Sequence, residues 1–283
     1  MYRYPSFYSF QDFSEARILE IKMALEQEAQ ALGVRGLVIL AGEGINSTLS
    51  GEPAAIERMK AMVRELLNDS QIFFKDTEAE IPGFRRFLVK IRPEIVTSSA
   101  HKSLAGQTTL GSIAATPTHL TPQQWDEMVQ REDVVVLDTR NEYEYEIGHF
   151  RGAIHPQIDH FDEFQAKLRE LEIPPDKKIL MYCTGGIRCE KAIFEAQELG
   201  FQNVFQLHGG IINYLAERKE AELAANSFNG ECFVFDERVA LTADLVPTKR
   251  YRICRTCGDA ADLQAPHQVH EDGRVICSGC LTR

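Results

Sequence analysis

The sequence of 283 residues predicts an α/β protein in three parts: an N-terminal α+β domain, a central α/β domain with a parallel sheet, and a small Cys-rich C-terminal module. Short apolar runs alternate with two amphipathic helices in the first third. After a stretch rich in Ser, Thr, Gly and Ala, apolar strands alternate with helices, which favours a parallel sheet. The C-terminal part holds five of the seven cysteines. The expected parts are residues 1–97, a linker at 98–117, residues 118–222 and residues 223–283.

The order of elements in the first part predicts a ferredoxin-like fold. An amphipathic helix is expected to begin at Ser14, a good N-cap residue, and to end at Gly33. A second helix has Pro53 in its first turn. The turn between two central strands, at Glu43-Gly44, is best explained as a tight hairpin, because no lysine or helix follows its glycines as in a phosphate loop. The expected elements are strand 6–10, helix 14–33, strands 36–42 and 44–51, helix 53–68 and a last strand at 85–92, in the order βαββαβ.

The central part alternates strands and helices from Thr121, which caps the first of its helices. In parallel α/β domains, active groups lie at the carboxyl ends of the strands. Asp138 and Cys183 are both expected there. The expected strands are 133–140, 177–183 and 203–207, and the expected helices are 161–171, a helix after Arg188, and 209–219.

The stretch CTGGIR predicts a reactive cysteine. Cys183 closes a strand, two glycines make a tight turn, and a helix begins near Arg188. Backbone N–H groups converge in such a turn and the helix N-terminus adds positive potential, so a thiolate is favoured over a thiol. The C-x4-R spacing is one residue shorter than the C-x5-R loop of cysteine phosphatases, so the loop suits a sulfur atom better than a phosphate. The predicted catalytic loop is Cys183, Thr184, Gly185, Gly186, Ile187 and Arg188.

Arg188 at the end of this loop and four neighbours of the loop have predicted roles. Asp138 and Arg140 are expected to form a structural ion pair that braces the loop, and His149 is expected to be structural. Arg188 is expected to stabilise an anion or a persulfide rather than to pair at the surface. Cys189 has two interpretations, a resolving thiol for an oxidised Cys183 or a structural residue of the helix.

The tail contains two C-x-x-C pairs separated by nineteen residues. This spacing predicts a four-cysteine zinc site. The alternative is a metal-free tail with reduced cysteines, and His267 or His270 could replace one ligand. Cys232 stands alone in an apolar segment and is expected to be a buried strand residue. The predicted zinc ligands are Cys254, Cys257, Cys277 and Cys280.

Charge is unevenly distributed along a chain whose net charge is −11. Residues 117–237 hold 23 acidic and 11 basic side chains. Two short stretches are instead basic and interleaved with aromatics, a composition that suits phosphates and stacked bases. The alternative for each is a solvated face. As an RNA interface they would grip the anticodon arm, with Phe84, Phe87 or Tyr251 stacking on a base. The expected RNA contacts are Arg85, Arg86, Lys90 and Arg92 in the first stretch and Lys249, Arg250, Arg252 and Arg255 in the second.

No apolar run reaches membrane-spanning length, and the N-terminus lacks the pattern of a signal peptide. We therefore expect a cytoplasmic protein without a membrane partner, whose cysteines are thiolates, metal ligands or core residues rather than disulfides. The sequence carries no signal for a particular oligomeric state.

The central part resembles a rhodanese domain, a fold whose cysteine loop carries a persulfide. Cys183 matches the nucleophile, Arg188 the residue that closes the loop, and Gly209-Gly210 the turn before the last helix. The segment that packs beneath the loop in that fold matches at Asp138, Arg140, Glu142, Gly148, His149, Gly152 and Ala153.

The combination of a ferredoxin-like N-terminus, a rhodanese domain with CTGGIRCEK and a Cys-rich tail resembles the bacterial tRNA uridine hydroxylase family over nearly the whole chain. The resemblance implies oxygen-dependent conversion of the wobble uridine of tRNA, position 34, to 5-hydroxyuridine. It implies tRNA as the partner, molecular oxygen as co-substrate and Cys183 as the essential residue. The alternatives are a sulfurtransferase that passes sulfane sulfur through a Cys183 persulfide, and a non-catalytic RNA-binding adaptor.

Overall fold

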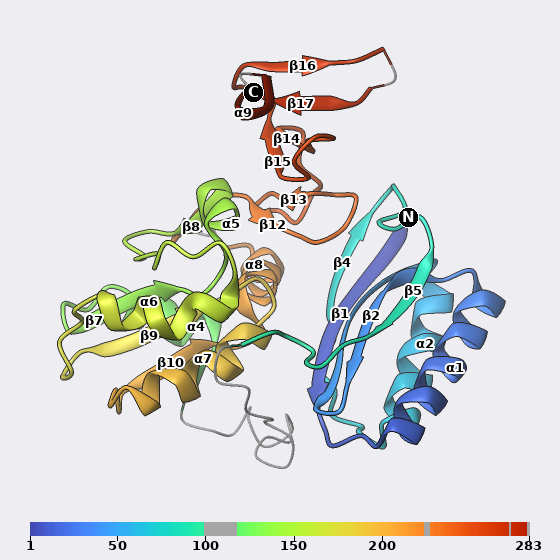
Figure 1. Ribbon diagram of the computed structural model, residues 1–283, viewed down its shortest axis with the longest axis horizontal. Coiled ribbons are helices and arrows are strands. Elements are labelled where there is room, and N and C mark those ends of the chain that lie inside the picture. The colour runs from blue at the N-terminus through green and yellow to red at the C-terminus, as the bar shows by residue number, and fades with distance from the viewer. Residues whose placement is uncertain (99–117, 224–226, 272, 282–283) are drawn as a thin grey trace.

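The computed structural model describes residues 1–98, 118–223, 227–271 and 273–281, arranged in three parts (Figure 1). The N-terminal and central domains lie side by side, and the C-terminal module lies above them in this view. The predicted linker, apart from its first residue, falls outside the described residues.

The N-terminal domain is a five-stranded sheet with order β4-β1-β3-β2-β5. The predicted helix caps are confirmed. The Ser14 side chain accepts the Arg17 N–H, and Gly33 ends the helix in the left-handed conformation at φ 66°. The elements are β1 (Tyr2–Phe10), α1 (Glu15–Leu32), β2 (Arg35–Ala41), β3 (Gly44–Ser50), α2 (Pro53–Leu66), β4 (Lys75–Ala79) and β5 (Phe87–Ile91).

The ferredoxin-like order is confirmed, but its last strand is not the one predicted. The segment 85–92 forms β5, an additional edge strand that runs parallel to β2. The fourth strand of the ferredoxin-like sheet is β4, which pairs antiparallel with β1. Sequence patterning misses β4 because its inward-facing residues include Lys75 and Thr77, so no apolar alternation is visible.

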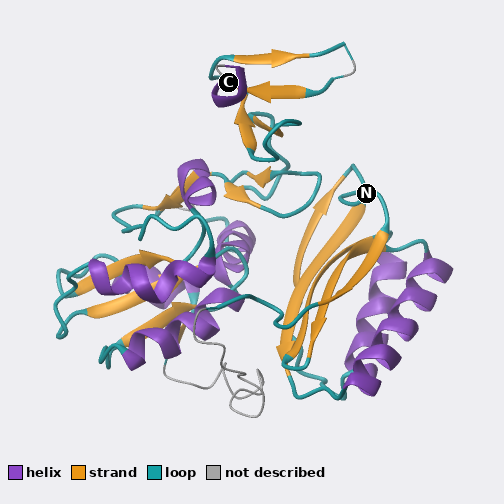
Figure 2. Ribbon diagram, in the orientation of Figure 1, coloured by secondary structure: helices purple, strands orange, loops and turns teal. Residues whose placement is uncertain are grey.

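The two faces of this sheet have different partners. Helices α1 and α2 cover one face, where a cluster around Ile21, Leu40 and Met59 forms the core. The other face points toward the central domain (Figure 2). Alternation along β1 places Phe7 on the helical side and Tyr8 on the side of the central domain. The helices of the N-terminal domain therefore cover only one face of its sheet, and the central domain covers the other face.

The central domain contains the predicted parallel sheet, with order β6-β10-β9-β7 and parallel pairing throughout. Thr121 caps its first helix through a capping box with Gln124. The elements are β6 (His119–Leu120), α4 (Pro122–Met128), β7 (Val134–Asp138), α5 (Glu142–Ile147), β8 (Gly148–Phe150), η1 (Phe161–Glu163), α6 (Phe164–Glu170), β9 (Lys178–Tyr182), α7 (Ile187–Glu198), β10 (Val204–Leu207) and α8 (Gly210–Glu220).

The segment after α8 belongs partly to the central domain. Strand β11 pairs with β8, and Cys232 and Leu241 pack into the core of the central domain. Cys232 is buried in a strand, as expected. The remaining strands form three two-stranded ribbons that lead away to the C-terminus. The elements are β11 (Phe228–Gly230), β12 (Cys232–Phe233), β13 (Ala240–Leu241), β14 (Tyr251–Ile253), β15 (Ala260–Asp262), β16 (His267–Val269), β17 (Val275–Cys277) and α9 (Ser278–Leu281).

Buried charges join the two domains through α7. The Tyr8 hydroxyl donates to Glu190 Oε1 at 2.8 Å. Glu190 and Lys191 are both buried, although the helical pattern alone places them on the solvent side. Charged groups are seldom buried without a partner, so these contacts define the interface between the two domains. Lys191 Nζ donates to three oxygens of the N-terminal domain: Glu43 Oε1 (3.0 Å), Glu94 Oε2 (3.2 Å) and the Val96 carbonyl (2.8 Å).

Candidate active site

The cysteine loop lies between β9 and α7, at the carboxyl end of the parallel sheet. Cys183 follows the last residue of β9 and is 1% exposed. The Gly186 N–H donates to Cys183 Sγ at 3.0 Å. Gly186 caps α7 at φ 98°, a left-handed conformation that favours glycine. The loop therefore directs backbone N–H groups at the sulfur, as the sequence predicts.

The start of α8 supports the loop from below. The N–H groups of Ile211 and Ile212 donate to the carbonyls of Cys183 and Thr184, at 3.0 and 3.1 Å. A Cβ atom on Gly210 would lie 2.5 Å from the Cys183 carbonyl oxygen. Only glycine allows this approach, which explains the glycine pair before the last helix.

The environment of Cys183 favours the thiolate. Burial raises its pKa, but several neighbours lower it more. These are a hydrogen bond from the Cys189 thiol, the charge of Arg188, and the backbone N–H groups of Arg188 and Gly185. Together they bring the pKa of Cys183 to about 5. Cys183 is therefore ionised at neutral pH.

The Arg188 guanidinium is paired with a residue that the sequence analysis did not identify. Its Nη1 and Nη2 donate to the two carboxylate oxygens of Glu144, at 2.6 and 2.8 Å. The Thr184 hydroxyl also donates to Glu144, at 3.1 Å. Glu144 lies on α5 within an alternating Glu and Tyr segment, where nothing in the sequence separates it from its exposed neighbours. Arg188 thus acts on Cys183 through its charge, while Glu144 fixes its orientation.

Asp138 and Arg140 form a fully buried ion pair. Arg140 Nη2 donates to Asp138 Oδ2 at 2.6 Å and to the Gly148 carbonyl at 2.6 Å. The guanidinium carbon of Arg140 lies 5.5 Å from the centre of the ring of Tyr182, the residue directly before Cys183. The His149 ring stacks on the Tyr145 ring, with 4.0 Å between the two ring centres. The expected ion pair between Asp138 and Arg140 is present, whereas its bracing role and the structural role of His149 stay predictions.

Cys189 faces Cys183 rather than pointing away from it. Its thiol donates a hydrogen bond to the Cys183 sulfur, and its Sγ lies 3.6 Å from Thr139 Oγ1. Burial and the neighbouring Cys183 raise its pKa well above the ordinary range. Cys189 is a neutral thiol beside a thiolate, which suits a hydrogen-bond donor.

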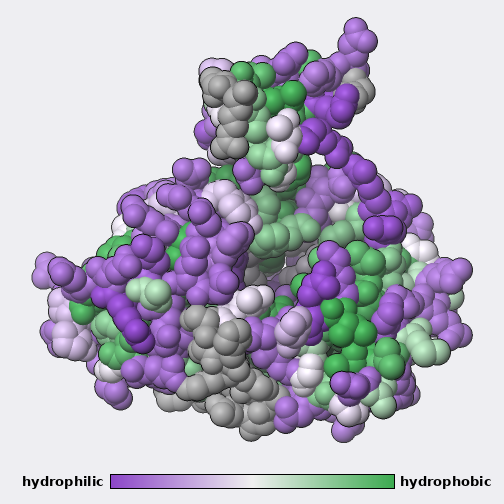
Figure 3. Space-filling view, in the orientation of Figure 1, coloured by the Kyte–Doolittle hydropathy of each residue, from purple (hydrophilic) through white to green (hydrophobic). Residues whose placement is uncertain are grey.

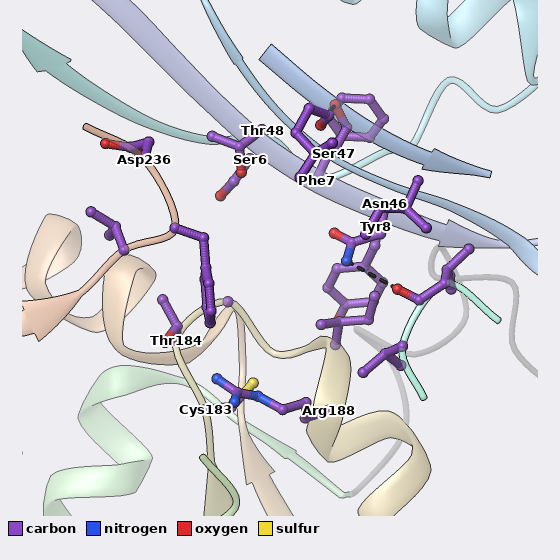
Figure 4. A pocket seen from close by; sticks show the side chains of 18 of the residues that line it. Ser6, Phe7, Tyr8, Asn46, Ser47, Thr48, Cys183, Thr184, Arg188 and Asp236 are labelled. Carbon is purple, nitrogen blue, oxygen red and sulfur yellow. Dashed lines mark hydrogen bonds between the residues drawn. The ribbon is translucent and has the colours of Figure 1, made fainter. Parts of the chain in front are cut away.

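A cavity of about 630 Å³ opens above Cys183, between the two domains. This volume is in the range of small-molecule sites. Figure 4 shows Cys183 and Arg188 on one side and the strands of the N-terminal domain on the other. Figure 3 shows the surface hollowed between the two larger parts. The lining from the N-terminal domain includes Ser6, Tyr8, Asn46, Thr48, Lys75 and Thr77, and the lining from the C-terminal segment includes Val234, Phe235, Asp236 and Arg238.

A second hollow, of about 520 Å³, adjoins this cavity and brings the two basic stretches together. Phe84 and Phe235 line both hollows. Four predicted RNA contacts line the second hollow: Arg85, Arg86, Lys90 and Arg255. A fifth, Arg92, lines the cavity itself. Stretches that are distant in sequence thus form one basic groove beside the cavity.

The other predicted RNA contacts lie outside this groove. Lys249 and Arg252 are exposed in the C-terminal module. Arg250 forms an ion pair with Asp262 at 2.6 Å across the β14–β15 ribbon.

Of the three aromatics expected to stack on a base, only Phe84 lines the groove. Phe87 packs against the core of the N-terminal domain, and Tyr251 is buried in a cluster with Ile147. Phe235, 58% exposed, was missed because its sequence context resembles an ordinary strand end.

The four tail cysteines are brought together. All four sulfur atoms lie within 4.8 Å of one another, so the cluster could hold a metal ion. Cys257 Sγ and Cys277 Sγ are 3.8 Å apart. A tetrahedral zinc ion with Zn–S bonds of about 2.3 Å places its sulfurs about 3.8 Å apart. The donor set and spacing fit zinc, and His267 instead contacts the Ala265 carbonyl.

None of the helices in the described ranges is both long and apolar enough to cross a membrane.

Comparisons with known proteins agree with this architecture. Residues 2–95 match the model of the UPF0176 acylphosphatase like domain, and residues 121–217 match that of the rhodanese-like domain. The chain is 41% identical to a tRNA uridine(34) hydroxylase of Bdellovibrio bacteriovorus, over 99% of this chain and 77% of the relative. It is 39% identical to the one of Synechocystis sp., over 88% and 87%, and 36% identical to one of Prochlorococcus marinus, over 100% and 86%. With a cysteine loop under an inter-domain cavity and this similarity along its length, the chain belongs to the tRNA uridine(34) hydroxylase family.

Proposed function

We propose that this protein hydroxylates the wobble uridine of tRNA to 5-hydroxyuridine and that Cys183 is its catalytic residue. The observation that carries the proposal is the position of the Cys183 sulfur beneath a cavity that both domains line. A nucleobase in this cavity would meet a thiolate on one side and the polar strand face of the N-terminal domain on the other. Molecular oxygen, which the family resemblance implies, serves as co-substrate.

The basic groove supplies a path for the substrate. Enzymes that modify a base in a folded nucleic acid bind the backbone and extrude the base into a pocket. Arg85, Arg86 and Arg255 line the groove, and Arg92 lines the cavity itself. These side chains bind phosphates of the anticodon arm, and Phe84 or Phe235 stacks on an unpaired base. The acidic central domain then needs no direct contact with the RNA backbone.

The tail holds one zinc ion through Cys254, Cys257, Cys277 and Cys280. Such an ion adds folding energy to a module that has few buried apolar residues. The protein acts in the cytoplasm. None of its seven cysteines forms a disulfide, which suits a reducing compartment.

A second candidate function is sulfur transfer through a Cys183 persulfide. The low pKa of Cys183, near 5, and the match to the rhodanese-like domain favour it. The two functions differ in their products, because sulfur transfer leaves no hydroxyl group on the wobble base.

Nucleoside mass spectrometry of tRNA from cells with and without the gene tests the proposal. Loss of 5-hydroxyuridine in the deletion strain, restored by the parent protein and not by Cys183→Ser, supports hydroxylation. An unchanged 5-hydroxyuridine level together with the loss of a thiolated nucleoside supports sulfur transfer instead. Full restoration by Cys183→Ser would leave the adaptor hypothesis.

A further inference from the structure

A lysine of the N-terminal domain lies inside the cavity next to the cysteine loop. Lys75 is the first residue of β4 and is only 5% exposed. It lines the cavity together with Cys183 and Gly185. A Cβ atom on Gly185 would lie 3.6 Å from Lys75 Cε, so the lysine side chain runs along the loop. The lysine reaches the site from another domain and is more than one hundred residues away in sequence.

The lysine ammonium has aromatic neighbours and, within the described ranges, no carboxylate in hydrogen-bond or ion-pair contact. Its Nζ lies 4.9 Å from the centre of the Tyr8 ring and 5.6 Å from that of Phe73. Among the described residues none accepts a hydrogen bond from it or forms an ion pair with it, whereas Lys60 on the opposite face pairs with Asp76 and Glu57. A buried charge without a counterion is costly, and positions of this kind cluster at functional sites.

We propose that Lys75 is a positioning residue of the active site, whose ammonium stabilises the Cys183 sulfur as a thiolate and so makes the N-terminal domain part of the cysteine's chemistry. The inference rests on the proposed role of Cys183. It does not require the substrate to be a uridine.

The protonation states agree with this role. Burial lowers the pKa of Lys75 to about 8, and the charges of Cys183 and Glu190 oppose that shift. Cys183 titrates near pH 5, where the ammonium is fully charged. The positive charge of Lys75 is therefore present throughout the titration of the Cys183 thiol. Removing that charge raises the pKa of Cys183. The other titratable or charged groups around the pair are Tyr8, His119, Glu144, Arg188, Cys189, Glu190 and His208.

The test is the pH profile of alkylation of Cys183 by iodoacetamide in the full chain, followed by peptide mass spectrometry. In Lys75→Met the midpoint is expected to rise by about one pH unit, a tenfold loss of thiolate at pH values below both midpoints. Lys75→Arg keeps the charge and is expected to restore the parent midpoint. Lys60→Met is the matched control, because it removes a buried lysine of the same domain from the other face of the sheet.

The outcomes separate this inference from the proposed function. A Lys75→Met midpoint equal to that of the parent overturns the role of Lys75, whatever the effect on tRNA. A shifted midpoint that Lys75→Arg restores supports it, even if no hydroxylation of tRNA is found. Circular dichroism checks folding, and Lys75→Gln replaces the Met variant if that variant does not fold. An equal shift in Lys60→Met would also overturn the inference, because the effect would then come from general loosening of the domain.

Discussion

Glu144 and Arg188 form a buried ion pair with two hydrogen bonds, of 2.6 and 2.8 Å, beneath the cysteine loop. The pair links α5 to the first turn of α7. Because both terminal nitrogens of the guanidinium contact Glu144, the orientation of Arg188 is fixed before any substrate arrives. The carboxylate also accepts the Thr184 hydroxyl and so holds two residues of the loop.

Glu144→Gln is expected to destabilise the protein, because it removes the carboxylate that forms both hydrogen bonds with the buried Arg188 guanidinium. Breaking a buried pair on one side costs about 3–5 kcal/mol. Urea unfolding should show the loss as a lower midpoint. The double variant Glu144→Gln/Arg188→Met should be less destabilised than the single variant. A Glu144→Gln midpoint within experimental error of the parent would contradict the ion pair's role.

Iodoacetamide should modify Cys183 with a half-maximal rate near pH 5, the pKa that its environment gives it. A free thiol has a pKa of about 8.5. The thiolate is the nucleophile, so the rate rises as pH increases through the pKa and is constant above it. Cys189 and Cys232, whose pKa values burial raises, are internal controls that should stay unmodified at neutral pH. A profile for Cys183 centred at or above the free-thiol value would show that the loop does not activate it.

Metal analysis of protein purified without chelators should find about one zinc per chain. Cys277→Ser should lose the metal and disorder the tail, because ligand binding and folding are coupled in such modules. His270→Ala changes a residue between the two pairs and should keep the metal. Metal-free protein with four titratable thiols in the tail would exclude the zinc site.

Replacing Arg85 and Arg86 together by Ala should weaken tRNA binding and flatten its dependence on salt. Each lost phosphate contact lowers the slope of log K against log salt by about 0.7–0.9. Binding isotherms at several salt concentrations measure this slope.

The control for this pair is Lys22→Ala/Arg58→Ala, which removes two charges from the helices on the far side of the sheet. Alkylation of Cys183 should be unchanged in both double variants, because it depends on the loop and its cavity. Equal slopes for the parent and Arg85→Ala/Arg86→Ala would mean that this part of the groove does not contact RNA.

Local signals in the sequence predicted most of the fold. Ser14, Gly33 and Thr121 mark helix ends through backbone hydrogen bonds that involve only near neighbours. The cysteine loop was also predictable, because a strand, a glycine turn and a helix follow one another within a few residues. The domain boundaries and the individual roles of the site residues stay predictions.

The missed features depend on long-range contacts. Strand β4 has polar inward-facing residues because it faces a cavity rather than a core. Glu144 is indistinguishable from exposed glutamates until the loop is placed above it. Lys191 lies on a helix face that would be solvent-exposed if the N-terminal domain did not cover it. Patterning within one segment cannot report a partner that comes from another domain.

The contacts of Lys191 have a consequence for protein engineering. The three hydrogen bonds that its ammonium donates all go to oxygens of the N-terminal domain. The central domain is therefore not expected to be stable when it is transferred to another protein on its own. If the central domain were expressed alone, the buried Glu190 and Lys191 would become exposed to solvent. The cavity beside Cys183 would lose the residues that the N-terminal domain contributes. A foreign rhodanese domain without a lysine at this position would remove the ammonium that Glu43 and Glu94 contact. The two domains are therefore expected to change together, and a chimera should succeed only when the helix after the cysteine loop is exchanged along with its acidic partners.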